Sequence, residues 1–127
     1  MAHEAAVHRW DAESAFGEPE PISPRLAADG IDEWFDVHLR SDIVEPEVTG
    51  DASGTIHVHG TDTEGEWWAS LSDRTLELER VHRKGDVAVR GPASDLLLVL
   101  WGRRPPSTVE VLGDTAVLDS WLAVPDI

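Results

Sequence analysis

Cysteine is absent from this sequence of 127 residues, and so is any long apolar run. Without cysteine the chain can form neither a disulfide nor a thiolate metal site, and it has no cysteine nucleophile. The longest apolar run, Leu96 to Trp101, is far shorter than the roughly 20 residues that a membrane-spanning helix needs. No basic segment followed by an apolar one opens the sequence, so we expect no signal peptide and a cytoplasmic location.

Positive charge is also scarce, since one lysine and nine arginines face 25 acidic residues and the net charge is −15. Residues 1–66 hold sixteen acidic side chains against three arginines, and residues 67–127 hold nine against seven basic ones. Such a surface repels duplex DNA, RNA and anionic lipid, so we expect no nucleic-acid partner and no membrane partner. The acidic face either aids solubility or contacts a basic partner.

What is present fits one globular domain of class α+β. The apolar residues recur at helical spacing near both ends of the chain and alternate in its middle. The pattern predicts helices over 3–15, 24–40, 93–102 and 114–122. It predicts strands over 55–59, 66–71, 75–82, 87–90 and 107–112. Because the connections between the first four strands are short, we predict a five-stranded, mostly antiparallel sheet with helices on one face.

A single boundary divides the sequence. Residues 17–23 contain glycine and two prolines, which predict a stiff, extended linker. The linker separates an orphan N-terminal helix, residues 1–16, from a domain over residues 24–127. We expect the stiff linker to make folding back of that helix harder.

Four sequence motifs of this chain occur together in one known family. They are His57-Val58-His59-Gly60-Thr61-Asp62, Gly65-Glu66-Trp67, Lys84-Gly85-Asp86-Val87-Ala88-Val89-Arg90-Gly91-Pro92-Ala93 and Asp95-Leu96-Leu97-Leu98-Val99-Leu100-Trp101-Gly102-Arg103. In this order they resemble the C-terminal domain of the mycothiol-dependent maleylpyruvate isomerases, an actinobacterial family of metal enzymes. The resemblance implies a sterol-carrier-like fold for residues 24–127. It also implies that residues 1–16 are the last helix of the family's N-terminal, metal-binding helical bundle.

The first predicted helix carries one candidate metal site. Glu4 and His8 lie four positions apart and therefore share a helical face, as two metal ligands or as an ordinary exposed pair. The resemblance favours metal ligands, because Ala6-Val7-His8-Arg9-Trp10-Asp11 matches the string around the family's histidine. The family's third ligand has no counterpart here, and His3 lies about 140° round the helix from His8. Zinc or another divalent metal is therefore expected only if a partner supplies a third ligand.

Arg103 is the candidate catalytic residue. An arginine after a helix can simply stabilise the helix dipole. The resemblance implies instead that Arg103 faces the metal site across the domain interface, where a guanidinium could clamp a small carboxylate ligand. It also implies mycothiol as cofactor.

His57 and His59 lie two positions apart on a predicted strand, on one face and roughly 7 Å apart. Such a pair can bind a metal or can be ordinary strand residues. The resemblance favours a structural or interface role, since the family's metal ligands lie in the other domain.

Three functions remain in competition. The first is a binding or docking module that is not catalytic by itself. The second is one subunit of a split mycothiol-dependent metalloenzyme, either an isomerase or a thiol transferase. The third is a structural homo-oligomer. The apolar residues of the first helix predict either a homodimer through residues 4–16 or a helical-bundle partner chain.

Overall fold

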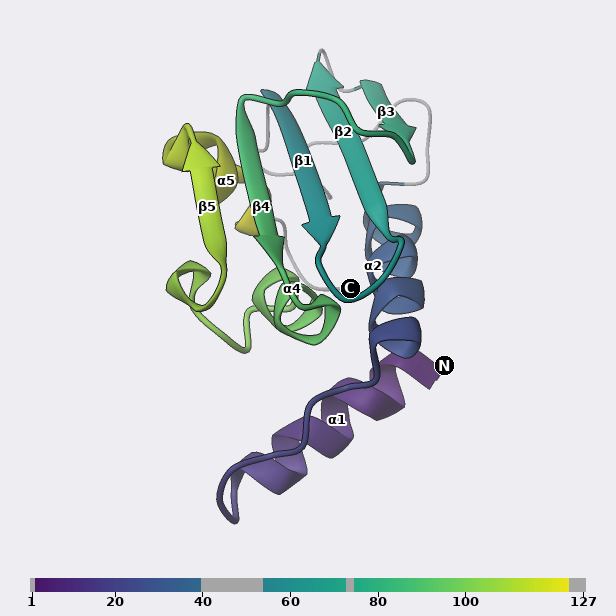
Figure 1. The fold of residues 1–127 in the computed structure, drawn as a ribbon, viewed down its shortest axis with the longest axis vertical. Helices are drawn as coiled ribbons and strands as arrows, with labels where there is room; N and C mark the ends of the chain where they lie inside the picture. Colours follow the sequence, from purple (N-terminus) through teal and green to yellow (C-terminus); the bar gives the residue numbers. More distant parts are fainter. Residues whose placement is uncertain (1, 40–53, 73–74, 124–127) are drawn as a thin grey trace.

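The computed structural model describes residues 2–39, 54–72 and 75–123 (Figure 1). The helices are α1 (Ala2–Ser14), α2 (Pro24–Leu39), α4 (Ala93–Leu100), α5 (Thr115–Leu122) and the short 3-10 helix η1 (Pro106–Thr108). The strands are β1 (Gly54–Gly60), β2 (Glu66–Ser72), β3 (Thr75–Glu79), β4 (Val87–Gly91) and β5 (Glu110–Gly113). This order confirms the predicted α+β class and the orphan first helix. No helix among the described residues is long and apolar enough to cross a membrane.

The strands form one sheet in the order β3-β2-β1-β4-β5 (Figure 1). Three of the neighbouring pairs are antiparallel, as predicted, whereas β1 and β4 run parallel. We expected short connections to join antiparallel neighbours, and this expectation was wrong for the connection between β3 and β4. The segment between β3 and β4 does not join neighbours, because it carries the chain past β2 and β1 to the far side of β1. The sheet is therefore mixed.

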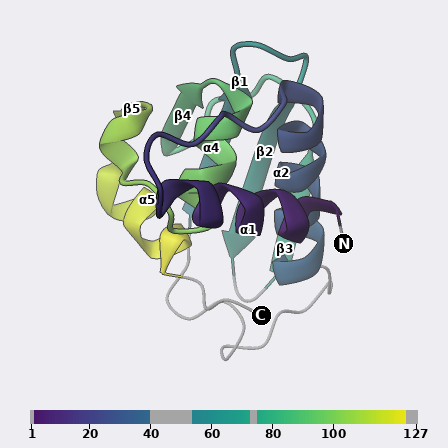
Figure 2. The same ribbon diagram turned by 90° about the horizontal axis from the view of Figure 1, so that it is seen from below.

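The two faces of the sheet differ in what covers them. Seen from below, the described helices lie on one side of the sheet (Figure 2). The side chains of β1, β2 and β4 on that side are at most 5% exposed, and they are Ile56, Val58, Trp67, Ala69, Leu71, Val87 and Val89. The alternation of a strand places His57, His59, Glu66 and Trp68 on the opposite face. No helix of the described chain packs over that face, which is called the open face below.

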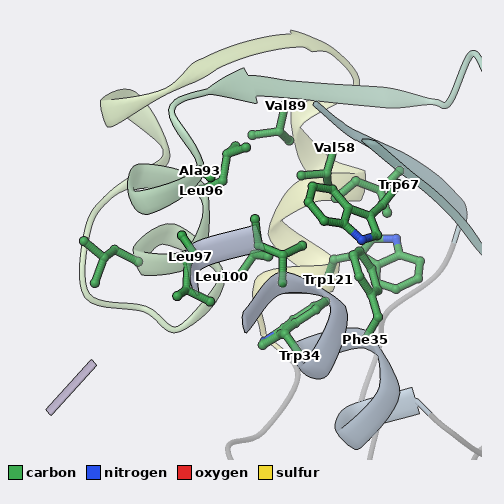
Figure 3. Close-up of a cluster of buried hydrophobic side chains, with 14 of the residues drawn as sticks. Trp34, Phe35, Val58, Trp67, Val89, Ala93, Leu96, Leu97, Leu100 and Trp121 are labelled. Atoms are coloured by element: carbon green, nitrogen blue, oxygen red, sulfur yellow. The ribbon is translucent and has the colours of Figure 1, made fainter. Parts of the chain in front are cut away.

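The core lies between the sheet and the helices. The run Leu96–Leu100 of α4 is apolar on all sides, and its residues are each at most 8% exposed, as the sequence predicted. Phe35 packs edge-on against Trp34, with ring centroids 5.0 Å apart, and against Trp121, with centroids 6.4 Å apart. These rings gather beside Trp67 of the sheet (Figure 3).

α1 packs against its own domain. Ala6 is 5% exposed and Val7 is 1% exposed, and both belong to the same hydrophobic core as the sheet. At the end of the linker Ile22 is 1% exposed, and its amide donates to Oγ of Ser94 at 2.9 Å. The expectation that a stiff linker hinders this folding back was wrong, because the linker is itself docked by Ile22.

Two predicted strand boundaries need correction. The strand predicted over 107–112 begins later, at β5, because Pro105 and Pro106 precede it. Successive prolines fix φ and remove donors, and the chain forms η1 there before it enters the sheet. The strand predicted over 75–82 ends at Glu79.

Candidate functional site

Four side chains that could bind one metal ion meet on the open face. His57 and His59 share this face on β1, and Glu66 lies directly opposite His59 in the antiparallel register with β2. His82 comes from the segment that follows β3. One nitrogen or oxygen atom from each of the four lies within 4.8 Å of the other three. Among the described residues, 2–39, 54–72 and 75–123, this is the one group of its kind.

One oxygen of Glu66 is the centre of this cluster. Its Oε1 lies 2.7 Å from Nε2 of His57, 3.5 Å from Nδ1 of His59 and 2.5 Å from Nδ1 of His82. Because an ionised carboxylate only accepts hydrogen bonds, the two nearest ring nitrogens must donate. The exposed fraction of the side chains rises from 8% for His57 through 22% for Glu66 and 33% for His59 to 78% for His82. The cluster is thus buried at His57 on the sheet and exposed to solvent at His82.

His82 is held by its neighbours in the segment 80–86, which is called the strap below. The guanidinium carbon of Arg83 lies 4.0 Å from the centroid of the Trp68 ring, as in a cation–π contact. Nε1 of Trp68 in turn donates to the carbonyl of Lys84 at 3.3 Å. Trp68 stands on the open face, so these contacts fasten the strap to the sheet and place His82 beside the two strand histidines.

Gly85 lets the strap approach β1 closely. A Cβ at this position would lie 3.1 Å from the backbone nitrogen of His57, so a larger residue would displace the strap or the strand. Beside this crossing, a hollow of about 370 Å³ opens on the same face. Its lining includes His57, His82, Arg83, Lys84, Asp86 and Leu112. The hollow therefore offers cationic, acidic and apolar groups next to the histidine cluster.

The histidines also change the acidity of Glu66. Partial burial alone would raise its pKa, but hydrogen bonds from His82 and His57 and the charges of His82 and His59 together outweigh that effect. The pKa of Glu66 therefore lies below its ordinary value of 4.5. A carboxyl whose pKa is lower in the folded state stabilises the fold above its unfolded pKa, and this stabilisation is lost as the pH falls through the folded pKa.

We expect the Glu66→Gln substitution to flatten the acid side of the pH–stability curve of the metal-free protein. Above pH 4.5 the carboxylate of Glu66 stabilises the fold, and below it that contribution disappears as the group is protonated. Glutamine cannot titrate, so the free energy of unfolding should fall less steeply with acid than in the parent. Urea unfolding at several pH values measures this slope. The exposed carboxylate Glu64, changed to glutamine, is the control, and an equal flattening in both variants would contradict the prediction.

The structure places His8 on the outer side of α1. Its side chain is 71% exposed, and its Nδ1 lies 3.8 Å from a carboxylate oxygen of Asp11. Glu4 belongs to α1, but its side chain lies outside the described residues. The described side chains of α1 therefore do not form a three-ligand site by themselves, and metal binding at Glu4 and His8 stays a prediction that requires a partner.

Arg103 reaches back to α1. Its Nε and Nη2 donate to the two carboxylate oxygens of Asp11 at 3.2 and 3.1 Å, and its Nη1 donates to the carbonyl of Trp101 at 3.0 Å. Asp11 thus connects the two residues that the resemblance selected, His8 and Arg103. A carboxylate ligand clamped by Arg103 would first have to displace Asp11. The catalytic role of Arg103 stays a prediction.

Glu66 and His82 were not among the residues that the sequence predicted for a site. A turn over 62–65 would pair residue 66 with residue 61, whereas the observed partner is His59, so the alternation predicted the face of Glu66 but the turn residues did not predict its partner. No local signal marks His82, because its position depends on the strap crossing the open face.

Most of the chain, including this cluster, matches a known protein family. The family described as the MDMPI C-terminal domain matches residues 25–120. The chain belongs to this family. The match confirms the resemblance to the maleylpyruvate isomerase C-terminal domain, and it includes His57, His59, Glu66 and His82 but not α1. No curated protein matches the chain.

Solved structures confirm the sterol-carrier-like fold. Sterol carrier protein 2 like 2 from Aedes aegypti superposes with a TM-score of 0.58 at 16% identity, over 81% of this chain and 100% of that one. The ubiquinone synthesis protein UbiJ-SCP2 gives 0.55 at 19% identity, over 78% of this chain and 92% of that one. The sec-alkylsulfatase Pisa1 from Pseudomonas sp. gives 0.60 at 18% identity, over 76% of this chain but only 16% of the sulfatase. At these identities the likeness is one of fold.

Proposed function

We propose that this chain is a non-catalytic binding module of the MDMPI C-terminal family that docks on a helical bundle through the outer face of α1. The observation that supports this proposal is the division of α1 into an anchored face and an exposed face. The anchored face makes α1 part of the domain surface. The exposed face leaves room for further helices beside it.

Three kinds of contact anchor α1. Ala6 and Val7 are buried in the hydrophobic core. Asp11 receives the paired hydrogen bonds of Arg103 described above. The guanidinium of Arg104 lies 5.3 Å from the ring centroid of Trp10, so a second arginine after α4 also holds the helix. A charge pair with two parallel hydrogen bonds fixes orientation as well as distance, so α1 is presented in one defined pose.

The exposed face of α1 carries two alanines, a histidine and an arginine. Ala5, His8, Arg9 and Ala12 are all exposed, and their spacing of three and four positions places them on one stripe, which Ala15 continues in the turn after the helix. Small side chains let a second helix approach closely. Phe16 continues this surface beyond the helix and is 93% exposed. His8, the family's metal-ligand position by resemblance, lies in the middle of the stripe.

Family membership supports a bundle as the occupant of this face, because the resemblance makes α1 the last helix of such a bundle. On this proposal the partner supplies the remaining metal ligand, and the mycothiol and small-carboxylate sites lie at the junction near Arg103. If the partner is catalytic, the chain is one subunit of a split mycothiol-dependent enzyme. A second copy of the chain on the same face is the alternative occupant.

We expect the Ala12→Arg substitution to weaken binding to a family bundle domain that lacks its last helix by at least about tenfold, or about 1.4 kcal/mol. The long charged side chain blocks close helix approach at the centre of the stripe. Calorimetric titration of the purified bundle domain measures the Kd. Ala116→Arg, at an exposed alanine of α5, is the matched control and should bind as the parent does.

The same titration separates the alternatives. Self-association of the parent in sedimentation runs, abolished by Ala12→Arg, would make a second copy the occupant. Isomerase turnover by the complex, but by neither component separately, would show that the chain is a subunit of a split enzyme. No association of either kind, or equal binding by Ala12→Arg and the parent, would refute docking through α1.

A further inference from the structure

We infer that His57, His59, Glu66 and His82 form a zinc site that belongs to this domain itself and is separate from the α1 position. The inference is independent of the docking proposal, since the cluster lies on the open face of the sheet, whereas α1 contacts α2 and, through Asp11, Arg103 after α4. It rests on the donor set, on the convergence of the donors at one point and on the construction that holds them there.

The donor set suits zinc. Zinc prefers imidazole nitrogen, thiolate and carboxylate ligands and adopts a tetrahedron in sites with four protein ligands. The sequence has no cysteine, so imidazole and carboxylate are the zinc ligands that its side chains offer, and this cluster holds three imidazoles and one carboxylate. A site of this composition also carries one negative charge against the two positive charges of the ion. The strongly acidic surface, with a net charge of −15, further favours a cation.

The donors already converge. Bonds of about 2.1 Å in a tetrahedron place the ligand atoms about 3.4 Å from one another. The four donor atoms here lie within 4.8 Å of one another, so no separation needs to shorten by more than about 1.4 Å. The separations of 2.7 and 2.5 Å from Oε1 of Glu66 to His57 and His82 need to lengthen by less than about 1 Å. His57 is 8% exposed on the central strand and can stay in place, whereas the side chain of His82 is 78% exposed and can adjust.

Without a metal ion, the three histidines share a single hydrogen-bond acceptor. One nitrogen of each ring lies 2.5 to 3.5 Å from the single oxygen Oε1 of Glu66. The three rings therefore compete for one acceptor oxygen. A divalent cation removes this conflict, because it takes a lone pair from each neutral ring and keeps the carboxylate as its fourth ligand.

A filled site would tie the strap to the sheet. Two ligands come from β1, one comes from β2, and His82 comes from the strap, so four-coordinate zinc would cross-link three segments. Four protein ligands close the coordination sphere, which is typical of zinc that stabilises a fold. The contacts of Arg83 and Lys84 with Trp68 hold the strap in the required place before metal arrives.

The test uses the full chain freed of metal with a chelator and titrated with Zn²⁺ in a calorimeter. We expect one equivalent to bind with submicromolar Kd, and we expect the midpoint of thermal unfolding to rise because the ion binds the folded state. His59→Ala, Glu66→Gln and His82→Ala should each weaken binding at least about 100-fold, more than loss of an outer-shell group usually costs. Circular dichroism verifies folding, and His82→Ala should fold because that side chain is mostly exposed.

His8→Ala is the matched control, because it removes a histidine of similar exposure from α1. It should bind zinc as the parent does. Loss of binding in His8→Ala, with retention in His82→Ala, would move the metal to α1 and overturn the inference. Failure of the folded parent to bind one equivalent, or parent-like affinity in both His59→Ala and His82→Ala, would also refute it.

Discussion

Replacing Trp121 with alanine is expected to lower the free energy of unfolding by about 3–5 kcal/mol. The side chain is 0% exposed and is one of the largest fully buried groups of the domain. It joins α5 to α2 through its edge-on contact with Phe35 (Figure 3). Its removal therefore takes away a large apolar contact and leaves a cavity at the junction of two helices. Equilibrium unfolding in urea, followed by tryptophan fluorescence and circular dichroism, measures the change.

Trp121→Phe is the matched comparison and should cost much less. Phenylalanine keeps an aromatic ring for the contact with Phe35. Within the described part of the chain, Nε1 of Trp121 is buried and has no hydrogen-bond partner. Phenylalanine removes this donor, which offsets part of the lost volume because an unpaired buried donor costs about 1–3 kcal/mol. Equal losses in the alanine and phenylalanine variants would show that the ring contact does not stabilise the fold.

The second large effect is expected at Gly113, where alanine should destabilise the fold by roughly 2–5 kcal/mol through strain and overpacking. Gly113 has φ of +105°, which L side chains rarely adopt. A Cβ there would lie 2.5 Å from the backbone carbonyl oxygen of Asp86, and that oxygen accepts the amide of Asp114 at 2.9 Å. Because the contact is with backbone, it cannot be relieved by rotating a side chain.

Gly102 provides the control for Gly113. It also has positive φ, +73°, but a Cβ there would meet nothing within 4 Å. Gly102→Ala should therefore cost only the conformational strain, about 1 kcal/mol. Thermal and urea unfolding of both variants separates strain from collision. Equal destabilisation would mean that the backbone at Gly113 relaxes away from Asp86 and that the tight approach is unimportant.

Local signals were sufficient to predict most of the fold. The apolar stripe of α2, the continuous apolar run of Leu96–Leu100 and the alternation around His57 each reflect one element and its buried face. The parallel pairing of β1 and β4 could not be derived this way, because it depends on which free edge of a hairpin a later strand joins. The delayed start of β5 depends on Pro105 and Pro106, because η1 forms there and takes up the first residues of the predicted strand.

The candidate site was less predictable than the fold. The alternation of side chains along a strand correctly placed His57 and His59 on one face. That pair alone does not distinguish a metal site from ordinary strand residues. The register of β1 with β2 adds Glu66, and the crossing of the strap adds His82, so the cluster is a property of tertiary structure. The candidate residues on α1, in contrast, were predicted from local sequence, since Glu4 and His8 belong to one short motif. The structure then links His8 to Arg103 through Asp11, a contact between residues 92 positions apart.

The parallel pairing of β1 with β4 also bears on synthesis of the chain. β1, β2 and β3 can form a meander as soon as they leave the ribosome, while β4 follows only later. Until β4 arrives, one side of β1 is an unpaired edge with free backbone donors and acceptors, which another nascent chain could join. The part of the chain already made by the end of the first hairpin turn, residues 1–66, carries sixteen acidic groups against three arginines. Mutual repulsion of this segment keeps neighbouring copies apart during the interval in which the central strand is unprotected.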